Sequence, residues 1–338
     1  MNEFVEARWW AREADGRIAC GLCPHGCRLR EGQTGICGVR AHVGGRLLSM
    51  SYARPTGFAV DPIEKKPLFH FLPGSPILSF GTLGCTLGCP WCQNWPQSQP
   101  ERALPAARRV SPEEIVALAR REGVPSIAYT YNEPTVFAEY MVDTARLARA
   151  QGIRNVAVTN GYITAEARPE VFADLDAANV DLKGFDEDFY RRETKGALRP
   201  VLETLEWIVR ETKIWLEITT LLIPERNDSD AMLTRECEWI RQRLGTDVPV
   251  HFTAFHPEFR MVDHPSTPAG TLTRARQIAR RAGLRFVYTG NVADPDGQST
   301  TCPECGVPLI ARTWHASRVV GLEGGRCRMC GTAIAGVW

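Results

Sequence analysis

The chain has 338 residues, of which 44% are hydrophobic, and its 40 basic residues balance 39 acidic ones. It can therefore bury a large core, and its balanced charge gives no electrostatic sign of binding to nucleic acid or to an acidic membrane. No apolar run approaches the roughly 20 residues that cross a bilayer, and the first residues lack the pattern of a signal peptide. We expect a cytoplasmic protein that does not bind a membrane, and nucleic acid is not the favoured partner.

The cysteines are grouped in a way that predicts metal binding. Of the twelve cysteines, Cys237 stands alone in a predicted helix, where we expect a buried, inert thiol. In a reducing compartment the other eleven are expected to bind metals rather than to form disulfides. They form three groups of four, three and four: Cys20, Cys23, Cys27 and Cys37; Cys85, Cys89 and Cys92; Cys302, Cys305, Cys327 and Cys330.

The first group predicts an N-terminal metal-binding module over residues 1–50. Its four thiolates suit either a zinc ion or a second iron–sulfur cluster, and the spacing alone slightly favours zinc. Residues 51–75 are rich in proline and glycine, so we expect a connecting segment of turns and extended chain.

The second group lies in the glycine-rich stretch 81–95, directly after the apolar run 76–80, which predicts a buried strand. Iron–sulfur clusters are usually held by four thiolates. Because Cys85, Cys89 and Cys92 have no fourth cysteine nearby, one iron would stay open for chemistry, as the open position does in catalytic zinc sites. The alternative is a zinc knuckle or a set of reduced structural thiols.

From Ser111 onward, helical and strand-like patterns alternate, which predicts parallel β/α units and a full or partial (β/α) barrel over residues 76–293. The expected helices are 111–122, 135–150, 164–175, 201–211, 231–244 and 271–282. The expected strands that follow the first are 126–131, 155–159, 179–182, 214–222, 250–255 and 286–288.

Polar residues follow several of these strands, and in a barrel they would meet at one mouth. Each has an alternative: Glu133 as a helix cap, Asn160-Gly161 as a common turn, and His256 as a structural histidine. Asp181 and Lys183 share one strand face and could form a solvated ion pair. The candidates are Asn132, Glu133, Thr159, Asn160, Asp181, Lys183 and His256.

The third group gives residues 294–338 two Cys-x2-Cys pairs, each followed by glycine. This pattern predicts a C-terminal zinc ribbon or a rubredoxin-like iron site.

The loop Cys85-Thr-Leu-Gly-Cys89-Pro-Trp-Cys92 resembles that of the radical SAM superfamily. The resemblance implies a [4Fe-4S] cluster on the three cysteines and S-adenosylmethionine on the open iron. It also implies reductive cleavage to a 5′-deoxyadenosyl radical that abstracts a hydrogen atom, and an external one-electron donor such as ferredoxin or flavodoxin.

The short motifs that follow the strands are similar to those of pyruvate formate-lyase activating enzyme and its relatives. By this resemblance Thr159, Asn160, Asp181, Lys183 and His256 bind S-adenosylmethionine. Where these enzymes have Gly-Gly-Glu for the methionyl amine, this chain has Tyr131-Asn132-Glu133, and where they have an aspartate for a monovalent cation it has Val158.

Over nearly its whole length the sequence resembles the AmmeMemoRadiSam-system radical SAM enzymes, whose name implies AMMECR-type and Memo-type partners. Our hypothesis is a radical SAM enzyme with a protein, a peptide or another substrate still to be identified. The alternatives are an activase for a glycyl-radical enzyme, an RNA-modifying enzyme that uses the ribbon as a reader, and a metal-binding scaffold without catalysis.

Overall fold

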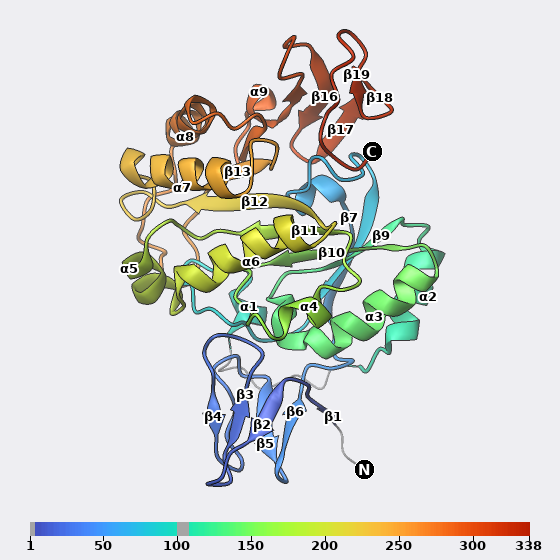
Figure 1. Cartoon of the computed structure of the whole chain (residues 1–338), viewed down its shortest axis with the longest axis vertical. Coiled ribbons are helices and arrows are strands. Elements are labelled where there is room, and N and C mark those ends of the chain that lie inside the picture. Colours follow the sequence, from blue (N-terminus) through green and yellow to red (C-terminus); the bar gives the residue numbers. More distant parts are fainter. Residues whose placement is uncertain (1–3, 100–107) are drawn as a thin grey trace.

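The computed structural model describes residues 4–99 and 108–338 (Figure 1). The centre of the molecule is an eight-stranded sheet with the strand order β14-β13-β12-β11-β10-β9-β8-β7. Its strands are β7 (Thr56–Pro62), β8 (Pro76–Gly81), β9 (Ser126–Tyr129), β10 (Arg154–Thr159), β11 (Ala177–Asp181), β12 (Trp215–Leu222), β13 (Val250–Ala254) and β14 (Val287–Gly290).

Neighbouring strands from β8 to β14 are parallel to each other. At the edge of the sheet, β7 pairs with β8 in the antiparallel direction. The predicted parallel β/α sheet is therefore confirmed. In the part of the chain that is described, β7 and β14 are the sheet edges and are not paired with each other, so a closed barrel is not shown.

Helices connect the parallel strands, as the alternating pattern predicted. Helix α2 begins at Ser111, whose side chain accepts from the backbone of Glu114 while the Glu114 side chain accepts from the backbone of Ser111. The helices of this region are α1 (Trp95–Ser98), α2 (Pro112–Arg121), α3 (Ala138–Ala150), α4 (Arg168–Val171), α5 (Glu187–Phe189), α6 (Leu198–Glu211), α7 (Asp230–Arg243) and α8 (Ala269–Arg281), with short turns η1 (Ile63–Lys65), η2 (Pro134–Phe137) and η3 (Tyr190–Thr194).

Two predicted elements differ from the structure. The segment 51–75 contains strand β7, which the sequence suggested only as an extended crossing. The helix expected over 164–175 is shorter in the structure, where only α4 is helical, because the segment before α4 binds the N-terminal module. The Thr164 hydroxyl donates to Gly21 O at 2.7 Å, and Thr164 N–H donates to Leu22 O at 3.1 Å.

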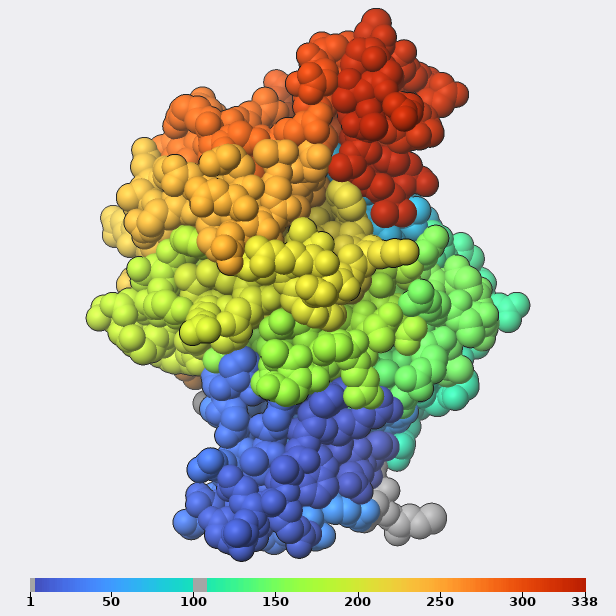
Figure 2. Space-filling view, in the orientation of Figure 1, coloured from blue at the N-terminus to red at the C-terminus, as the bar shows by residue number. Residues whose placement is uncertain are grey.

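Small modules of short strands lie at opposite ends of the molecule (Figures 1 and 2). The N-terminal one has the sheets β1-β6-β5 and β2-β3-β4. Its strands are β1 (Val5–Glu6), β2 (Trp10–Arg12), β3 (Ile18–Cys20), β4 (Arg28–Leu29), β5 (Arg40–Val43) and β6 (Arg46–Ser49). The C-terminal one follows α9 (Pro295–Gln298) and contains β15 (Thr300–Thr301), β16 (Pro308–Thr313), β17 (Ala316–Val319), β18 (Leu322–Glu323) and β19 (Arg326–Cys327).

The C-terminal module is fixed to the segment that leads into β8. Leu72 N–H donates to Val337 O at 2.8 Å, and Val337 N–H donates to His70 O at 2.7 Å. His70 is fully buried and also donates from Nδ1 to Ala335 O at 2.7 Å. No helix among the described residues is both long and apolar enough to cross a membrane.

Candidate active site

A cavity of about 540 Å³ opens at the carboxyl ends of the parallel strands, a size typical of small-molecule sites. One wall is the cysteine loop after β8, and others come from the ends of the strands that follow it. The cavity brings together nine predicted site residues: Cys85, Cys89, Cys92, Asn132, Glu133, Thr159, Asn160, Asp181 and Lys183.

The cysteine loop is held in place by its neighbours along the chain and across the fold. Gly88 N–H donates to Thr194 O at 2.8 Å, and the ring of Trp91 stacks on that of Phe189 at 5.7 Å. Gly84 has a positive φ of 90°, and a side chain there would meet the carbonyl oxygen of Cys37 at 2.4 Å. Glycine is thus required where the loop begins.

Asn132 and Asn160 anchor this loop from the neighbouring strands. Asn132 accepts from Thr82 N at 2.9 Å and donates to Gly84 O at 2.9 Å. Asn160 donates from Nδ2 to the Thr86 hydroxyl at 3.0 Å, and its Nδ2 lies 3.8 Å from Cys85 Sγ. Both amides therefore position the loop.

Glu133 is fully buried, and its carboxylate is saturated with protein donors. Oε1 accepts from Thr135 N–H at 2.9 Å, from the Thr135 hydroxyl at 2.6 Å and from the Thr159 hydroxyl at 2.7 Å, and Oε2 accepts from Asn160 N–H at 2.7 Å. Burial raises the pKa of Glu133, and these hydrogen bonds oppose that shift. The side chain caps η2, as the alternative interpretation of Glu133 proposed.

Asp181 and Lys183 form a partly buried ion pair in the cavity, with 2.7 Å between Oδ2 and Nζ. Burial disfavours the charge of Lys183, but Asp181 and the thiols of Cys89 and Cys92 reverse this effect and raise its pKa. Burial raises the pKa of Cys89 to about 12, and Lys183 opposes that shift. A fixed cation therefore lies beside the thiols, where it favours their thiolate form.

Cys85, Cys89 and Cys92 all line the cavity, and its other lining residues include no further cysteine. Three thiolates leave one iron of a four-iron cluster without a protein ligand, so the residues present fit such a cluster. Among the described residues, the groups of three or more ligand atoms that all lie within 4.8 Å of one another do not include this trio.

His256 is the exception among the predicted site residues. It is exposed and does not line the cavity, because the chain turns outward after the buried Phe255. From the same strand, His251 and Thr253 line the cavity instead, and His251 is held by Glu217 at 2.7 Å.

Sequence reasoning also missed the walls made by distant segments. The turn Trp314–His315 between β16 and β17 lines the cavity, as do residues 64–67 before β8 and Thr289–Asn291 at the end of β14. The segment Thr289–Asn291 could have been predicted, because residues at the carboxyl end of the final strand should line the site like those of the other strands. Residues 64–67 belong to the lead-in to β8, for which the resemblance to activating enzymes predicts a place beside the cluster. The Trp314–His315 turn had no signal, since it belongs to the C-terminal module and reaches the cavity only through the docking of that module.

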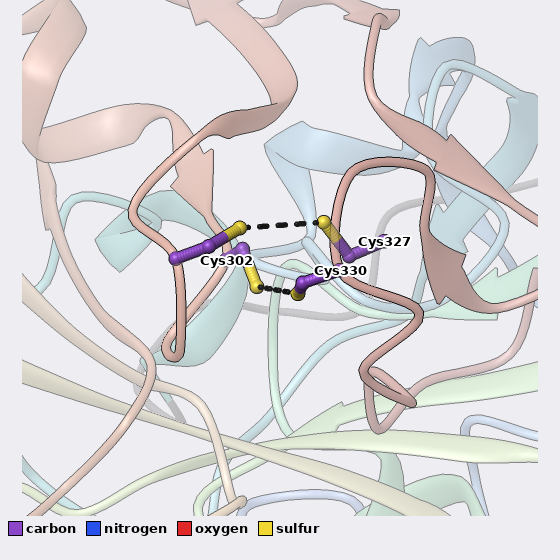
Figure 3. A group of neighbouring side chains, drawn as sticks. Cys302, Cys327 and Cys330 are labelled. Atoms are coloured by element: carbon purple, nitrogen blue, oxygen red, sulfur yellow. Dashed lines mark hydrogen bonds between the residues drawn. The ribbon is translucent and has the colours of Figure 1, made fainter.

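The C-terminal cysteines form a compact site of their own (Figure 3). Sγ atoms of Cys302 and Cys330 lie 3.6 Å apart, as do those of Cys305 and Cys327. All four lie within 4.8 Å of one another, the spacing of ligands around a single ion. This group could bind a metal ion, as the paired Cys-x2-Cys pattern predicted.

Comparison with known proteins agrees with this site. A profile of the Radical SAM superfamily matches residues 80–237. An uncharacterized protein of Methanocaldococcus jannaschii is 42% identical over 97% of this chain and 98% of its own length. A putative glycyl-radical enzyme activating enzyme of the same organism is 24% identical over 63% of this chain and 78% of its own.

Among solved structures, a radical SAM methyltransferase from Sphaerobacter thermophilus has the same fold. Its TM-score is 0.51 at 18% identity, with 70% of this chain and 71% of that chain covered. With its three cysteines in the loop that follows β8, the chain belongs to the Radical SAM superfamily of enzymes.

Proposed function

We propose that Cys85, Cys89 and Cys92 hold a [4Fe-4S] cluster whose open iron faces the cavity, and that S-adenosylmethionine binds there. The observation that carries this proposal is that the three cysteines line one cavity of about 540 Å³. When bound, the cluster supplies the electron for reductive cleavage of S-adenosylmethionine, which yields the hydrogen-abstracting 5′-deoxyadenosyl group. An external donor of the ferredoxin or flavodoxin class provides that electron.

The protein's own residues bind and orient the nucleotide. Lys183 offers an ammonium group to the methionyl carboxylate, and Asp181 offers carboxylate oxygens to hydroxyl or amino groups. Thr159 and Asn160 are at the neighbouring strand end, where they position the loop and border the ligand. Glu133 and Asn132 shape this part of the cavity, since their polar atoms already bond protein groups.

The substrate, in this proposal, binds on the side of the cavity bounded by the C-terminal module. Trp314 and His315 come from the end of the molecule opposite the N-terminal module (Figure 1). Together with Lys65 and Lys66 they make a mixed aromatic and basic wall. Such a wall suits a protein or peptide side chain, and AMMECR-type and Memo-type proteins are the partners that the sequence resemblance suggests.

We further infer that the open sheet is a partial β/α barrel with β7 and β14 at its edges. A cytoplasmic location is supported by the twelve cysteines, which are all free thiols. For the C-terminal site we favour zinc, because the four sulfurs have the spacing of a structural tetrahedral site.

The test is anaerobic reconstitution with iron and sulfide, followed by reduction with dithionite and quantification of 5′-deoxyadenosine. Cys89→Ala is expected to abolish the product, whereas Cys237→Ala, which removes a buried thiol far along the chain in α7, should keep it. If Cys89→Ala forms 5′-deoxyadenosine at the wild-type rate, the proposal is wrong.

A second candidate is an activase that installs a glycyl radical on a partner protein. The similarity to a putative glycyl-radical enzyme activating enzyme favours it. It predicts a glycyl doublet in the EPR spectrum of the partner, not of this chain, after S-adenosylmethionine is consumed.

A further inference from the structure

The cysteines of the N-terminal module converge on one point beside the active site. A side chain at Gly35 would lie 3.6 Å from Cys27 Sγ and 3.8 Å from Cys37 Sγ, so these sulfurs flank the same small space. Cys20 N–H donates to Cys27 O at 2.9 Å, and Gly26 N–H donates to Cys23 O at 3.1 Å, so the segment from Cys20 to Cys27 folds back on itself. The module therefore gathers four ligands around one centre.

A buried cation accompanies the group. The Arg40 guanidinium is 2% exposed and binds both oxygens of Glu139, at 3.0 and 2.6 Å, and its charge acts on Cys20 and Cys37. Its Nε is buried and donates to no atom of the described residues. A buried donor without an acceptor, beside a ring of sulfurs, is what an absent anionic group would leave behind.

These four sulfurs are less tightly grouped than those of the C-terminal site. In the C-terminal site of the same chain, paired sulfurs lie 3.6 Å apart and all four fall within 4.8 Å of one another. Within the described chain, the N-terminal sulfurs do not meet that limit even three at a time. Around one zinc, with Zn–S about 2.3 Å, the sulfurs would be about 3.8 Å apart, whereas a cubane separates its thiolates because each binds a different iron.

We propose that Cys20, Cys23, Cys27 and Cys37 hold a second, fully ligated iron–sulfur cluster that delivers electrons to the active-site loop. This proposal differs from the slight preference for zinc that the spacing in sequence suggested. The proposed role follows from contact between the two loops: His25 donates from Nε2 to Thr86 O at 2.6 Å, and the Cys37 carbonyl packs against Gly84. Both contacts are next to Cys85.

In the proposed step, one electron leaves an external ferredoxin- or flavodoxin-type donor, reduces the N-terminal cluster and passes on to the active-site cluster. No bond is formed or broken in this transfer, and no proton moves. The N-terminal site has no open iron and takes no substrate, so its part is conduction only.

The first experiment measures acid-labile sulfide and metals after anaerobic reconstitution. A variant without the active-site ligands, with Cys85, Cys89 and Cys92 all changed to Ala, is expected to keep about four sulfides per chain, half of the roughly eight in the wild type. A rubredoxin-like C-terminal site would add iron but no sulfide. A variant that holds no sulfide and gains zinc instead would overturn the proposal.

The second experiment replaces ligands of the N-terminal site and leaves the active-site cysteines intact, so that poor folding of one variant does not decide the outcome. Cys23→Ser with Cys37→Ser is expected to lose about half of the sulfide and the EPR signal of one reduced cluster. Cys237→Ser, a matched change of a thiol in α7, should lose neither. Full sulfide in the double variant would equally overturn the proposal.

The third measurement tests conduction. With dithionite, the Cys23→Ser, Cys37→Ser variant should form 5′-deoxyadenosine at close to the wild-type rate, because a small reductant reaches the cavity directly. With a protein donor the rate should fall at least tenfold. Equal loss with both reductants would show a structural role, and the conduction part of the proposal would fail while the proposed function at Cys85, Cys89 and Cys92 would stand.

Discussion

At the scale of single residues, Asn160 connects the end of β10 with the cysteine loop. Its amide lies 3.8 Å from Cys85 Sγ, and its Oδ1 accepts from Tyr162 N–H at 2.9 Å. Asn160→Ala is expected to cost about 1–3 kcal/mol of stability, because a buried N–H loses its partner. It should also lower the reduction potential of the cluster, because a donor near sulfur is lost.

Urea unfolding and an EPR-monitored redox titration measure these two effects separately. Asn155→Ala is the control, because its side chain bonds Ala145 O and Asp174 O in the core. It should reduce stability in a similar way and leave the potential unchanged. An unchanged potential in Asn160→Ala would show that this amide only positions the backbone.

Two buried groups give the protein opposite responses to acid. Burial lowers the pKa of His70 to about 4, so its contribution to stability is present above pH 6.5 and is lost as the pH falls through 4. Burial raises the pKa of Glu236 to about 7, so its contribution is present below pH 4.5 and is lost as the pH rises through 7. From pH 7 to pH 5 each changes the unfolding free energy by about 2 kcal/mol, with opposite signs.

Single variants should separate these effects. As the pH falls from 7 to 5, the unfolding free energy of His70→Asn should rise by about 2 kcal/mol relative to that of the wild type. The unfolding free energy of Glu236→Gln should fall by about the same amount relative to the wild type. Urea titrations at the two pH values measure the differences. Parallel pH profiles for all three proteins would contradict the assigned pKa shifts.

At the scale of elements, the turn between β16 and β17 and the end of β11 are expected to recognise different ligands. Asp181→Ala removes the charged partner that we propose for S-adenosylmethionine and should weaken its binding about tenfold to a hundredfold. Trp314→Ala, on the module's side of the cavity, should change that affinity less than twofold. Equilibrium dialysis with the reconstituted enzyme measures both, and a tenfold loss in Trp314→Ala would mean that the nucleotide reaches the C-terminal turn.

The elements of the sheet could be predicted because their signals are local. The capping box at Ser111 and Glu114 and the apolar run before Cys85 specify their elements without help from distant residues. Helix α4 and the position of His256 could not be predicted in this way. The first is shortened by bonds between Thr164 and the N-terminal module, and the second depends on where the loop after Phe255 turns.

At the scale of the whole molecule, the metal in the C-terminal site is expected to hold one wall of the active site in place. Changing Cys305 and Cys330 together to Ser should remove one metal ion per chain and make residues 294–338 sensitive to limited proteolysis, since small metal sites supply much of their own folding energy. Metal analysis and mass spectrometry of the fragments test this. Resistance equal to that of the wild type would show that the module folds without its metal.

The same docking has a consequence for how the enzyme matures in the cell. The cavity needs both the Glu64–Pro67 segment and the Trp314–His315 turn, which leave the ribosome at very different times. During synthesis the cysteine loop is therefore exposed before the Trp314–His315 turn, which lines the same cavity, has been made. We expect the thiols to be more accessible to iron and to oxygen in that interval than in the folded protein.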